Sequence, residues 1–272
     1  MTTPSPAGPP ALPQFYEFDA PRSWRAIDLV SDLHLEASRP RTLDAFAAHL
    51  RTTPADAVFI LGDLFEAWIG DDARFEGFEQ QVLQLLQEAS ARLSLAFMAG
   101  NRDFLVGTAM LRDAGIAALP DPTVLRAFGE RVLLTHGDAL CLSDVAYQRF
   151  RAMVRSPAWC AEALARPLAE RRAYAQQMRS ASAETQRLQR PEQWADVDAS
   201  AAVRWMHEAA APVLVHGHTH RPGGQDLAPG YRREVLSDWE LDVADAAPRA
   251  EVIRLSLRGL ERLAPSGLAA AP

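Results

Sequence analysis

The chain has 272 residues, of which 48% are hydrophobic and 23% are charged. This length and composition suit one large α/β domain or two small ones, and they exclude a disulfide-stapled mini-protein, a disordered chain and a fibrous one. The net charge is −7, so the chain as a whole offers no electrostatic footprint for nucleic acid, and we expect no nucleic-acid partner. Two cysteines are too few for a disulfide framework and suit a reducing cytoplasm.

The two ends of the chain differ in composition from its middle. We interpret residues 1–22 as a disordered N-terminal extension, because 1–14 is rich in Pro, Ala, Ser and Thr and lacks the basic and apolar regions of an export signal. Residues 265–272 are expected to fray. No stretch approaches the roughly 18 consecutive apolar residues of a transmembrane helix, so any contact with a membrane would be at its surface.

Five short apolar runs are each followed at once by polar residues with metal-binding chemistry. Continuous apolar runs of this length are typical of strands buried on both faces, and helical spacing follows the first two. Ligands of an α/β sheet lie beyond the carboxyl ends of its strands, so the five polar clusters are predicted to converge on one site. The runs cover 26–30, 57–61, 93–99, 132–135 and 213–215.

A segment of different character, 144–210, lies between the fourth and fifth runs and is predicted to be an inserted helical cap broken by prolines. Over 144–190 it holds nine arginines against four acidic residues, interleaved with apolar side chains such as Phe150 and Trp159. Two interpretations stay open: a lid with a solvated arginine face, or a surface that binds an anionic amphiphile. Later apolar runs, 234–236 and 251–257, suggest strands of a second sheet.

The polar clusters supply carboxylate, amide and imidazole ligands and no thiolate. That mixture suits Mn²⁺, Fe²⁺, Co²⁺ or Zn²⁺ at five or six coordination better than a structural zinc. Seven such ligands would serve two ions if one carboxylate bridged them. Two metals roughly 3.5 to 4 Å apart clamp the attacking and leaving oxygens of a phosphoryl displacement, so hydrolysis of a phosphoester or phosphoanhydride is the predicted chemistry.

These motifs resemble the calcineurin-like metallophosphoesterase superfamily. Its pattern of D-x-H, G-D, G-N-H-[DE], H and G-H-x-H is met in order from Asp32 to His220. The longer strings GDLFEAWIGDD from Gly62, GNRDFL from Gly100 and HGD from His136 are similar to the UDP-2,3-diacylglucosamine diphosphatases of lipid A biosynthesis. The resemblance implies a four-layer α/β/β/α sandwich over 23–264, with the cap at 144–210 inserted in it.

The same resemblance assigns roles to individual residues. It implies two divalent metal ions, Mn²⁺ being the expected one, with Asp63 as the bridge and Asp63, Asn101 and Arg102 as the catalytic residues. One metal would be held by Asp32, His34, Asp63 and His220, and the other by Asp63, Asn101, His136 and His218. The substrate would be contacted by Asn101, Arg102, Asp144, Ser182, Gln186, Gln189 and His218.

Arg102 stands where most members of the superfamily have a histidine. A guanidinium stays protonated under working conditions, so it cannot act as a general acid. A phosphate leaving group, whose second pKa is near about 6, can depart unprotonated while a guanidinium grips its oxygens. Arg102 therefore favours a diphosphate substrate. The alternative is a surface arginine paired with Asp103 or Asp72.

The implied activity is hydrolysis of the diphosphate of UDP-2,3-diacylglucosamine to UMP and 2,3-diacylglucosamine 1-phosphate. The partners would be this acylated sugar nucleotide and the inner-membrane surface, on whose cytoplasmic face the protein would lie peripherally; nothing implies an obligate protein partner. A soluble nucleotide or protein phosphatase of the same superfamily is the alternative enzyme, against which the basic amphipathic cap argues. A catalytically inactive scaffold is the second alternative, but such a protein should have lost ligands and none is missing.

Overall fold

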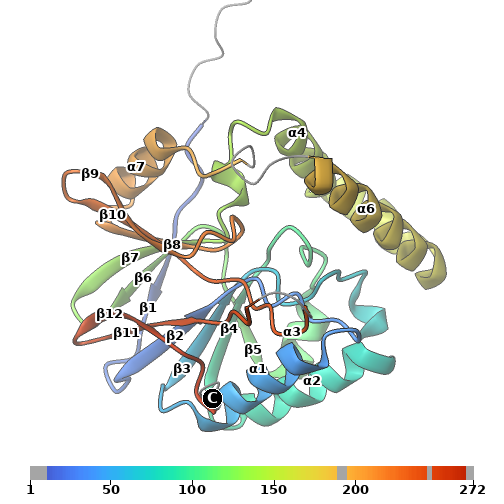
Figure 1. Ribbon diagram of the computed structural model, residues 1–272, viewed down its shortest axis with the longest axis horizontal. Helices are drawn as coiled ribbons and strands as arrows, with labels where there is room; N and C mark the ends of the chain where they lie inside the picture. The colour runs from blue at the N-terminus through green and yellow to red at the C-terminus, as the bar shows by residue number, and fades with distance from the viewer. Residues whose placement is uncertain (1–10, 189–194, 244–246, 268–272) are drawn as a thin grey trace, which may run out of the picture.

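The computed structural model describes residues 11–188, 195–243 and 247–267, which form two six-stranded sheets packed face to face. Helices lie outside both sheets, which confirms the predicted four-layer α/β/β/α sandwich (Figure 1). One sheet has the order β12 (Gly259–Leu263), β11 (Val252–Ser256), β2 (Ala26–Val30), β3 (Ala57–Leu61), β4 (Ser94–Met98), β5 (Ile116–Ala118). The other has the order β1 (Tyr16–Asp19), β6 (Thr123–Ala127), β7 (Glu130–Thr135), β8 (Val213–His216), β10 (Tyr231–Val235), β9 (Gly223–Ala228).

The central strands β2 and β3 are apolar on both faces because each face is covered. Leu29 and Phe59 lie in the cluster between the two sheets, together with Leu134 of β7. Val30 and Ile60, one residue further on, point to the opposite face and lie in the cluster beneath the helices. Since a strand covered on both sides has no polar face, β3 is an unbroken apolar run, and the one charged residue of β2, Asp28, is buried and paired with Arg254.

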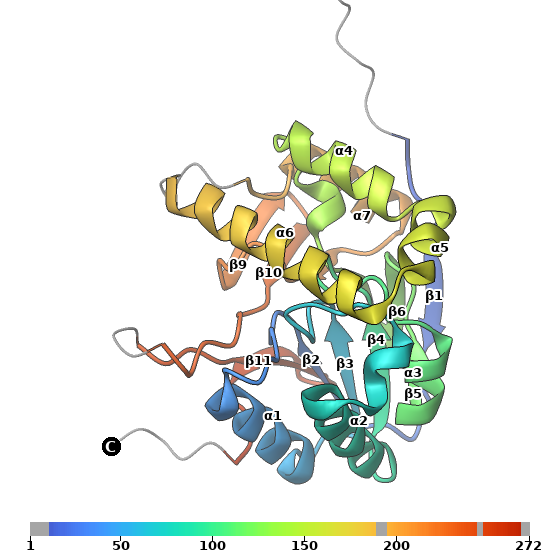
Figure 2. The same cartoon turned by 90° about the vertical axis from the view of Figure 1, so that its right-hand side faces the viewer.

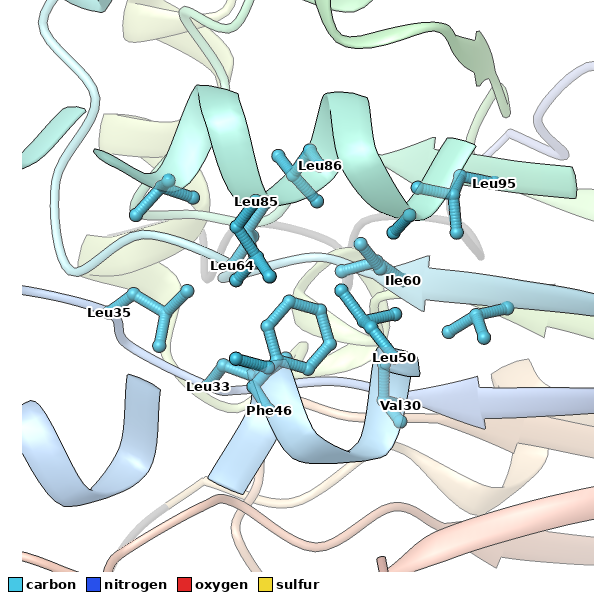
Figure 3. Packing of buried hydrophobic residues seen from close by; sticks show 14 of the residues in the cluster. Val30, Leu33, Leu35, Phe46, Leu50, Ile60, Leu64, Leu85, Leu86 and Leu95 are labelled. Carbon is cyan, nitrogen blue, oxygen red and sulfur yellow. The ribbon is translucent and has the colours of Figure 1, made fainter. Parts of the chain in front are cut away.

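Three helices cover the outer face of the sheet that contains β2 and β3: α1 (Pro40–Thr52), α2 (Gly77–Ser90) and α3 (Thr108–Ala114), with the short 3₁₀ helix η1 (Asp71–Phe75) before α2. Figure 3 shows how α1 and α2 meet over this sheet, with Phe46 and Leu50 on one side of Ile60 and Leu85 and Leu86 on the other. Burying a side chain of this size contributes about 1.5–3 kcal/mol to folding. This layer holds the ends of β2, β3 and β4 in fixed positions.

The helix α7 (Ala199–Glu208) corrects the predicted extent of the cap. The prediction assigned 144–210 to one inserted segment, but α7 covers the outer face of the second sheet and forms the fourth layer of the sandwich (Figure 1). Its Ala202 and Met206 are fully buried against Leu133 and Leu214 of that sheet. An amphipathic helix near a basic insertion looks the same in sequence whether it packs on the cap or on the sheet.

The cap proper consists of α4 (Val145–Val154), α5 (Pro157–Ala165) and α6 (Leu168–Leu188), which lie over the edge where β2, β3 and β4 end (Figure 2). It follows the 3₁₀ helix η2 (Asp138–Leu140). Most of the cap arginines form ion pairs with the body of the protein, so a solvated arginine face is not their main use. These pairs join Arg151 and Arg155 to Asp138, Arg171 to Asp72, Arg172 to Glu76, and Arg179 to Glu36 and Glu66.

Both ends of the described chain are more ordered than the sequence predicted. The strand β1 lies within the expected extension 1–22, but it pairs in parallel with β6, so this part of the extension belongs to the sheet. Near the other end, the Ser266 backbone N–H donates a 3.0 Å hydrogen bond to His49 Nδ1, which holds the start of the expected frayed tail against α1. Among the described helices, none has the length and apolar character needed to cross a bilayer.

Candidate metal centre

The five polar clusters meet at one edge of the sandwich, although they come from both sheets. Those after β2, β3 and β4 belong to one sheet, and those after β7 and β8 to the other. The two sheets approach closely at this edge: Gly62 has φ +92°, and a Cβ there would collide with the His136 imidazole of the other sheet. Glycine at 62 therefore allows the two halves of the site to touch.

The backbone is strained where the side chains enter the site. Five predicted metal ligands have positive φ, a conformation that costs non-glycine residues of the order of 1–3 kcal/mol and concentrates at functional sites. They are Asp32 (54°), His34 (48°), Asp63 (54°), His218 (67°) and His220 (50°). Strain repeated at so many neighbouring residues indicates that side-chain placement, not folding stability, dictates the local backbone.

One half of the site gathers Asp32, His34 and His220, whose ligand atoms all lie within 4.8 Å of one another. The His34 and His220 Nε2 atoms face each other at 3.2 Å. Asp32 Oδ1 lies 3.5 Å from His220 Nε2 and 3.9 Å from His34 Nε2. Within the described chain, Asp32 Oδ1 is buried with no hydrogen-bond partner. A bound cation would satisfy this orphaned oxygen, because buried polar atoms are otherwise paired.

The other half gathers Asn101, His136 and His218. Asn101 Oδ1 is 2.9 Å from His136 Nε2 and 2.8 Å from His218 Nδ1. The opposite nitrogen of His136, Nδ1, is 2.9 Å from the Leu61 carbonyl, an arrangement that turns Nε2 towards the site. Each of these three residues follows a different strand: Asn101 follows β4, His136 follows β7 and His218 follows β8.

Asp63 lies between the two halves. Its Oδ2 is 4.0 Å from His34 Nε2 and its Oδ1 is 3.7 Å from His136 Nε2, so the two carboxylate oxygens point to different groups. A second candidate cation group, Asp32 with Asp63 and His136, overlaps the first. The structure thus brings together all seven predicted metal ligands, with carboxylates at the centre and imidazoles on both sides.

Carboxylates dominate the electrostatic environment of His136. Burial lowers the pKa of His136, but the carboxylates of Asp63, Asp32 and Asp138 outweigh burial and raise this pKa to about 9. In the absence of a metal ion, a proton on the His136 imidazole therefore supplies positive charge at this site. Carboxylate, amide and imidazole donors around buried negative charge fit divalent metal ions.

A second set of residues supports the ligands. Asp103 accepts backbone N–H groups from Gly100 (2.8 Å) and Leu64 (2.7 Å), which ties the loops after β3 and β4 together. The sequence predicted this orienting use of Asp103. It did not single out Glu66, whose Oε2 is 3.0 Å from His34 Nδ1, or Asp238, whose Oδ2 is 3.6 Å from His220 Nδ1. The only signal for Glu66 was its place in the string that begins at Gly62.

Arg102 lies beside the metal ligands, at the entrance to a cavity that it lines. Its Nη1 is 3.6 Å from Glu66 Oε1. The alternative of a surface arginine paired with Asp103 or Asp72 is wrong, because Asp103 accepts backbone N–H groups and Asp72 pairs with Arg171. The guanidinium therefore lies beside Glu66 and lines the cavity.

The predicted substrate contacts in the cap are placed less completely. Asp144 is exposed and caps α4, where its carboxylate accepts the N–H of Tyr147 at 2.9 Å. Ser182 and Gln186 lie on α6 within 181–188, where only the backbone is described, and Gln189 lies outside the described residues. Their contact with substrate stays a prediction.

A cavity of about 490 Å³ joins the metal centre to the interior of the cap. Asn101 and Arg102 line its polar end. Its remaining wall is mostly apolar and is contributed by the body and by all three cap helices. Among the lining residues are Phe104, Leu105, Phe150, Trp159, Tyr174 and Met178.

Comparison with known proteins agrees with this geometry. The family model of calcineurin-like phosphoesterases matches residues 26–222, which contain all seven predicted ligands. The chain belongs to this family. Within this family, the chain, called the phosphoesterase below, groups with proteins named UDP-2,3-diacylglucosamine hydrolase.

Two such relatives are representative. The UDP-2,3-diacylglucosamine hydrolase of Xanthomonas axonopodis pv. citri (strain 306) is 45% identical over 221 residues, covering 77% of this phosphoesterase and 90% of the relative. That of Stenotrophomonas maltophilia (strain K279a) is 42% identical over 221 residues, covering 77% and 89%. Among solved structures, zinc-bound Vps29 from Entamoeba histolytica aligns over 88% of this chain and 98% of its own, with a TM-score of 0.42 and 12% identity.

We expect cation binding to this phosphoesterase to release protons. Because the pKa of His136 is raised to about 9, the metal-free imidazole is protonated at neutral pH, and a cation must displace that proton. Affinity for Mn²⁺ should therefore rise as the pH increases from about 6.5 to about 8.5. Titration calorimetry in buffers of different ionisation enthalpy measures the released proton directly.

The matched control is His207→Gln, which removes an exposed histidine and should leave proton release unchanged. His136→Gln should weaken binding and flatten its pH dependence. Proton release that is the same in wild type and His136→Gln would contradict this assignment.

Proposed function

We propose that this phosphoesterase hydrolyses the diphosphate bond of UDP-2,3-diacylglucosamine, releasing UMP and 2,3-diacylglucosamine 1-phosphate for lipid A biosynthesis. The observation that carries the proposal is one cavity that Asn101 and Arg102 line beside the metal ligands and whose remaining wall is mostly apolar. These two parts match the two parts of such a substrate, the diphosphate and the acyl chains. The names of the 42–45% identical relatives support the same reaction.

The seven ligands would hold two divalent ions, with Mn²⁺ as the proposed metal. Asp32, His34 and His220 would bind one ion, Asn101, His136 and His218 the other, and Asp63 both. The divergent oxygens of Asp63, aimed at His34 and His136, support its bridging role. When bound, such a pair of ions lowers the pKa of a water molecule and neutralises charge on the phosphoryl oxygens.

Arg102 would bind the oxygens of the diphosphate as the bond to the leaving phosphate breaks. It keeps its positive charge at any working pH, so it stabilises developing negative charge without transferring a proton. Its place at the polar end of the cavity, next to Asn101, supports this role. Water adds across the P–O–P bridge, and the leaving group departs as a phosphate that needs no general acid.

The cap would hold the acyl chains. Phe150, Trp159 and Met178 come from three different cap helices and line the same cavity, so an acyl chain entering it would leave water on several sides. Each buried methylene contributes about 0.8 kcal/mol, which makes the acyl chains the main source of affinity. A soluble nucleotide or protein phosphatase would have no use for this apolar wall, and an inactive scaffold would not need all seven ligands.

Arg102→Ala should lower kcat by about 10²-fold, the usual effect of losing one preorganised donor to the transition state. The reason is that the other described arginines of the cavity wall, Arg166, Arg171 and Arg179, are already paired with carboxylates. Steady-state hydrolysis of UDP-2,3-diacylglucosamine, with bound metal quantified in parallel, measures the effect. Arg112→Ala is the control, because Arg112 is exposed on α3 and pairs with Asp113. An Arg102→Ala enzyme that keeps wild-type kcat would contradict the proposed binding of the diphosphate by Arg102.

Removing both acyl chains from the substrate should lower kcat/KM by at least about 10³-fold, since the apolar end of the cavity would then gain nothing from burial. The measurement compares UDP-2,3-diacylglucosamine with UDP-glucosamine at saturating Mn²⁺. Asp63→Ala should be inactive on both, which shows that turnover comes from this site. Equal kcat/KM values for the two substrates would favour a soluble nucleotide phosphatase with an ordinary lid.

We further propose that the enzyme works on the cytoplasmic face of the inner membrane, with α4 towards the lipid. Val145, Arg149 and Met153 are exposed and four residues apart, so they form one stripe along α4. Tyr147 and Arg151 occupy the other face and bind Asp138 of the body. An apolar stripe that contains an arginine fits the surface of an anionic bilayer.

Replacing Val145 and Met153 together by Asp should strongly reduce cosedimentation with phosphatidylglycerol vesicles, and added salt should weaken wild-type binding through Arg149. Leu257→Asp is the control, because Leu257 is the most exposed large hydrophobic side chain of the described residues and lies in the turn between β11 and β12, on the body rather than in the cap. Unchanged cosedimentation of the double variant, or an equal loss in Leu257→Asp, would rule out α4 as the contact surface.

A further inference from the structure

Glu66 contacts three groups that belong to three different parts of the enzyme. Its Oε2 lies 3.0 Å from Nδ1 of His34, a predicted metal ligand. Its Oε1 lies 3.0 Å from Nε of Arg179 on α6 and 3.6 Å from Nη1 of Arg102. The side chain is 12% exposed, so these contacts replace most of its water.

The contact with His34 fixes a metal ligand. His34 Nδ1 and Glu66 Oε2 lie at ion-pair distance, without the geometry of an aligned hydrogen bond. A carboxylate on the Nδ1 side of a histidine leaves Nε2 as the nitrogen free for a metal and favours one orientation of the ring. His34 Nε2 does face the site, 3.2 Å from His220 Nε2. Losing such a supporting carboxylate typically weakens metal binding by 10–100-fold.

The contact with Arg179 fixes the cap. Arg179 also places Nη2 2.8 Å from Glu36 Oε2, so one guanidinium spans two carboxylates of the body. On α6, Arg179 directly follows Met178, and both residues line the cavity together with Tyr174. Holding Arg179 therefore holds this wall of the cavity against the metal centre.

We propose that Glu66 is a positioning residue that couples the docking of the cap to the geometry of the metal centre. His34 and Arg179 contact the two oxygens of the same carboxylate, so the position of each bears on the other. Other ion pairs also hold the cap, but this one reaches a predicted metal ligand. The proposal rests on the proposed function only for Arg102; the contacts with His34 and Arg179 concern the protein itself.

The chain contains a matched control for a salt bridge between the cap and the body. Asp72 forms a two-fold contact with Arg171, also on α6, and the Arg171 Nη1–Asp72 Oδ1 distance is 2.8 Å. Asp72 touches none of the seven predicted metal ligands in the described structure. Asp72→Asn should therefore loosen α6 without altering His34.

The experiment compares Glu66→Gln, Asp72→Asn and Arg179→Gln in two assays that need no substrate. The first is titration of the metal-free protein with Mn²⁺, and the second is amide hydrogen exchange in α6. Glu66→Gln should weaken Mn²⁺ binding by about 10-fold or more and also speed exchange in α6. Asp72→Asn should speed exchange in α6 but keep Mn²⁺ affinity within about threefold of wild type. Arg179→Gln, which frees one oxygen of Glu66, should speed exchange in α6 and also weaken Mn²⁺ binding, though by less than Glu66→Gln.

Two outcomes would overturn the proposal. Glu66→Gln with wild-type Mn²⁺ affinity would show that Glu66 does not position His34. Equal losses of Mn²⁺ affinity in Glu66→Gln and Asp72→Asn would show that cap docking in general, not Glu66, controls the site. Should Glu66→Gln not fold, Glu66→Asp replaces it: the charge is kept, but the shorter side chain should still weaken Mn²⁺ binding. Since neither assay contains substrate, a wrong substrate assignment would leave both results unaffected.

Discussion

The structure is organised around buried carboxylates that must stay charged. Asp32, Asp63 and Asp138 are nearly or fully inaccessible to solvent, and all three lie at the edge where the two sheets meet. An isolated buried charge costs several kcal/mol, so each needs compensation from nearby positive charge or hydrogen bonds. This need to compensate buried negative charge accounts for what surrounds the edge. The strained loops place the ligands there, and the histidines, the cap arginines and the proposed metal ions supply positive charge.

The cap takes part in this compensation, which explains its basic composition. Asp138 Oδ2 accepts from Tyr147 (2.7 Å) and Arg151 (2.8 Å), and Arg155 Nη2 lies 3.3 Å away. Burial raises the pKa of Asp138, but these arginines outweigh it and hold the pKa far below its usual value. The cap arginines, which in the sequence suggested binding of an anionic amphiphile, thus mainly attach α4 and α6 to the body. The proposed membrane contact uses the outer stripe of α4 instead.

The sequence predicted the parts of the molecule that local patterns determine. Each strand that carries a ligand was recognised because burial on both faces leaves a mostly apolar run, and the ligands were recognised because they follow such runs closely. Parallel strands ending at one edge then bring Asp32 and Asn101 together across about 70 residues of chain. Local sequence was sufficient here because the geometry of strands does the rest.

The features that the sequence did not reveal depend on contacts between residues that are far apart in the chain. The packing of α7 on the second sheet and the pairing of β1 with β6 depend on partners distant in the chain, and neither has a signature of its own. The same holds for Glu66, whose importance comes from Arg179, 113 residues later. A carboxylate that follows a metal ligand by three residues can lie on a solvated turn or bridge two layers. Only the position of the cap distinguishes these, and it makes Glu66 part of both the metal centre and the cavity wall.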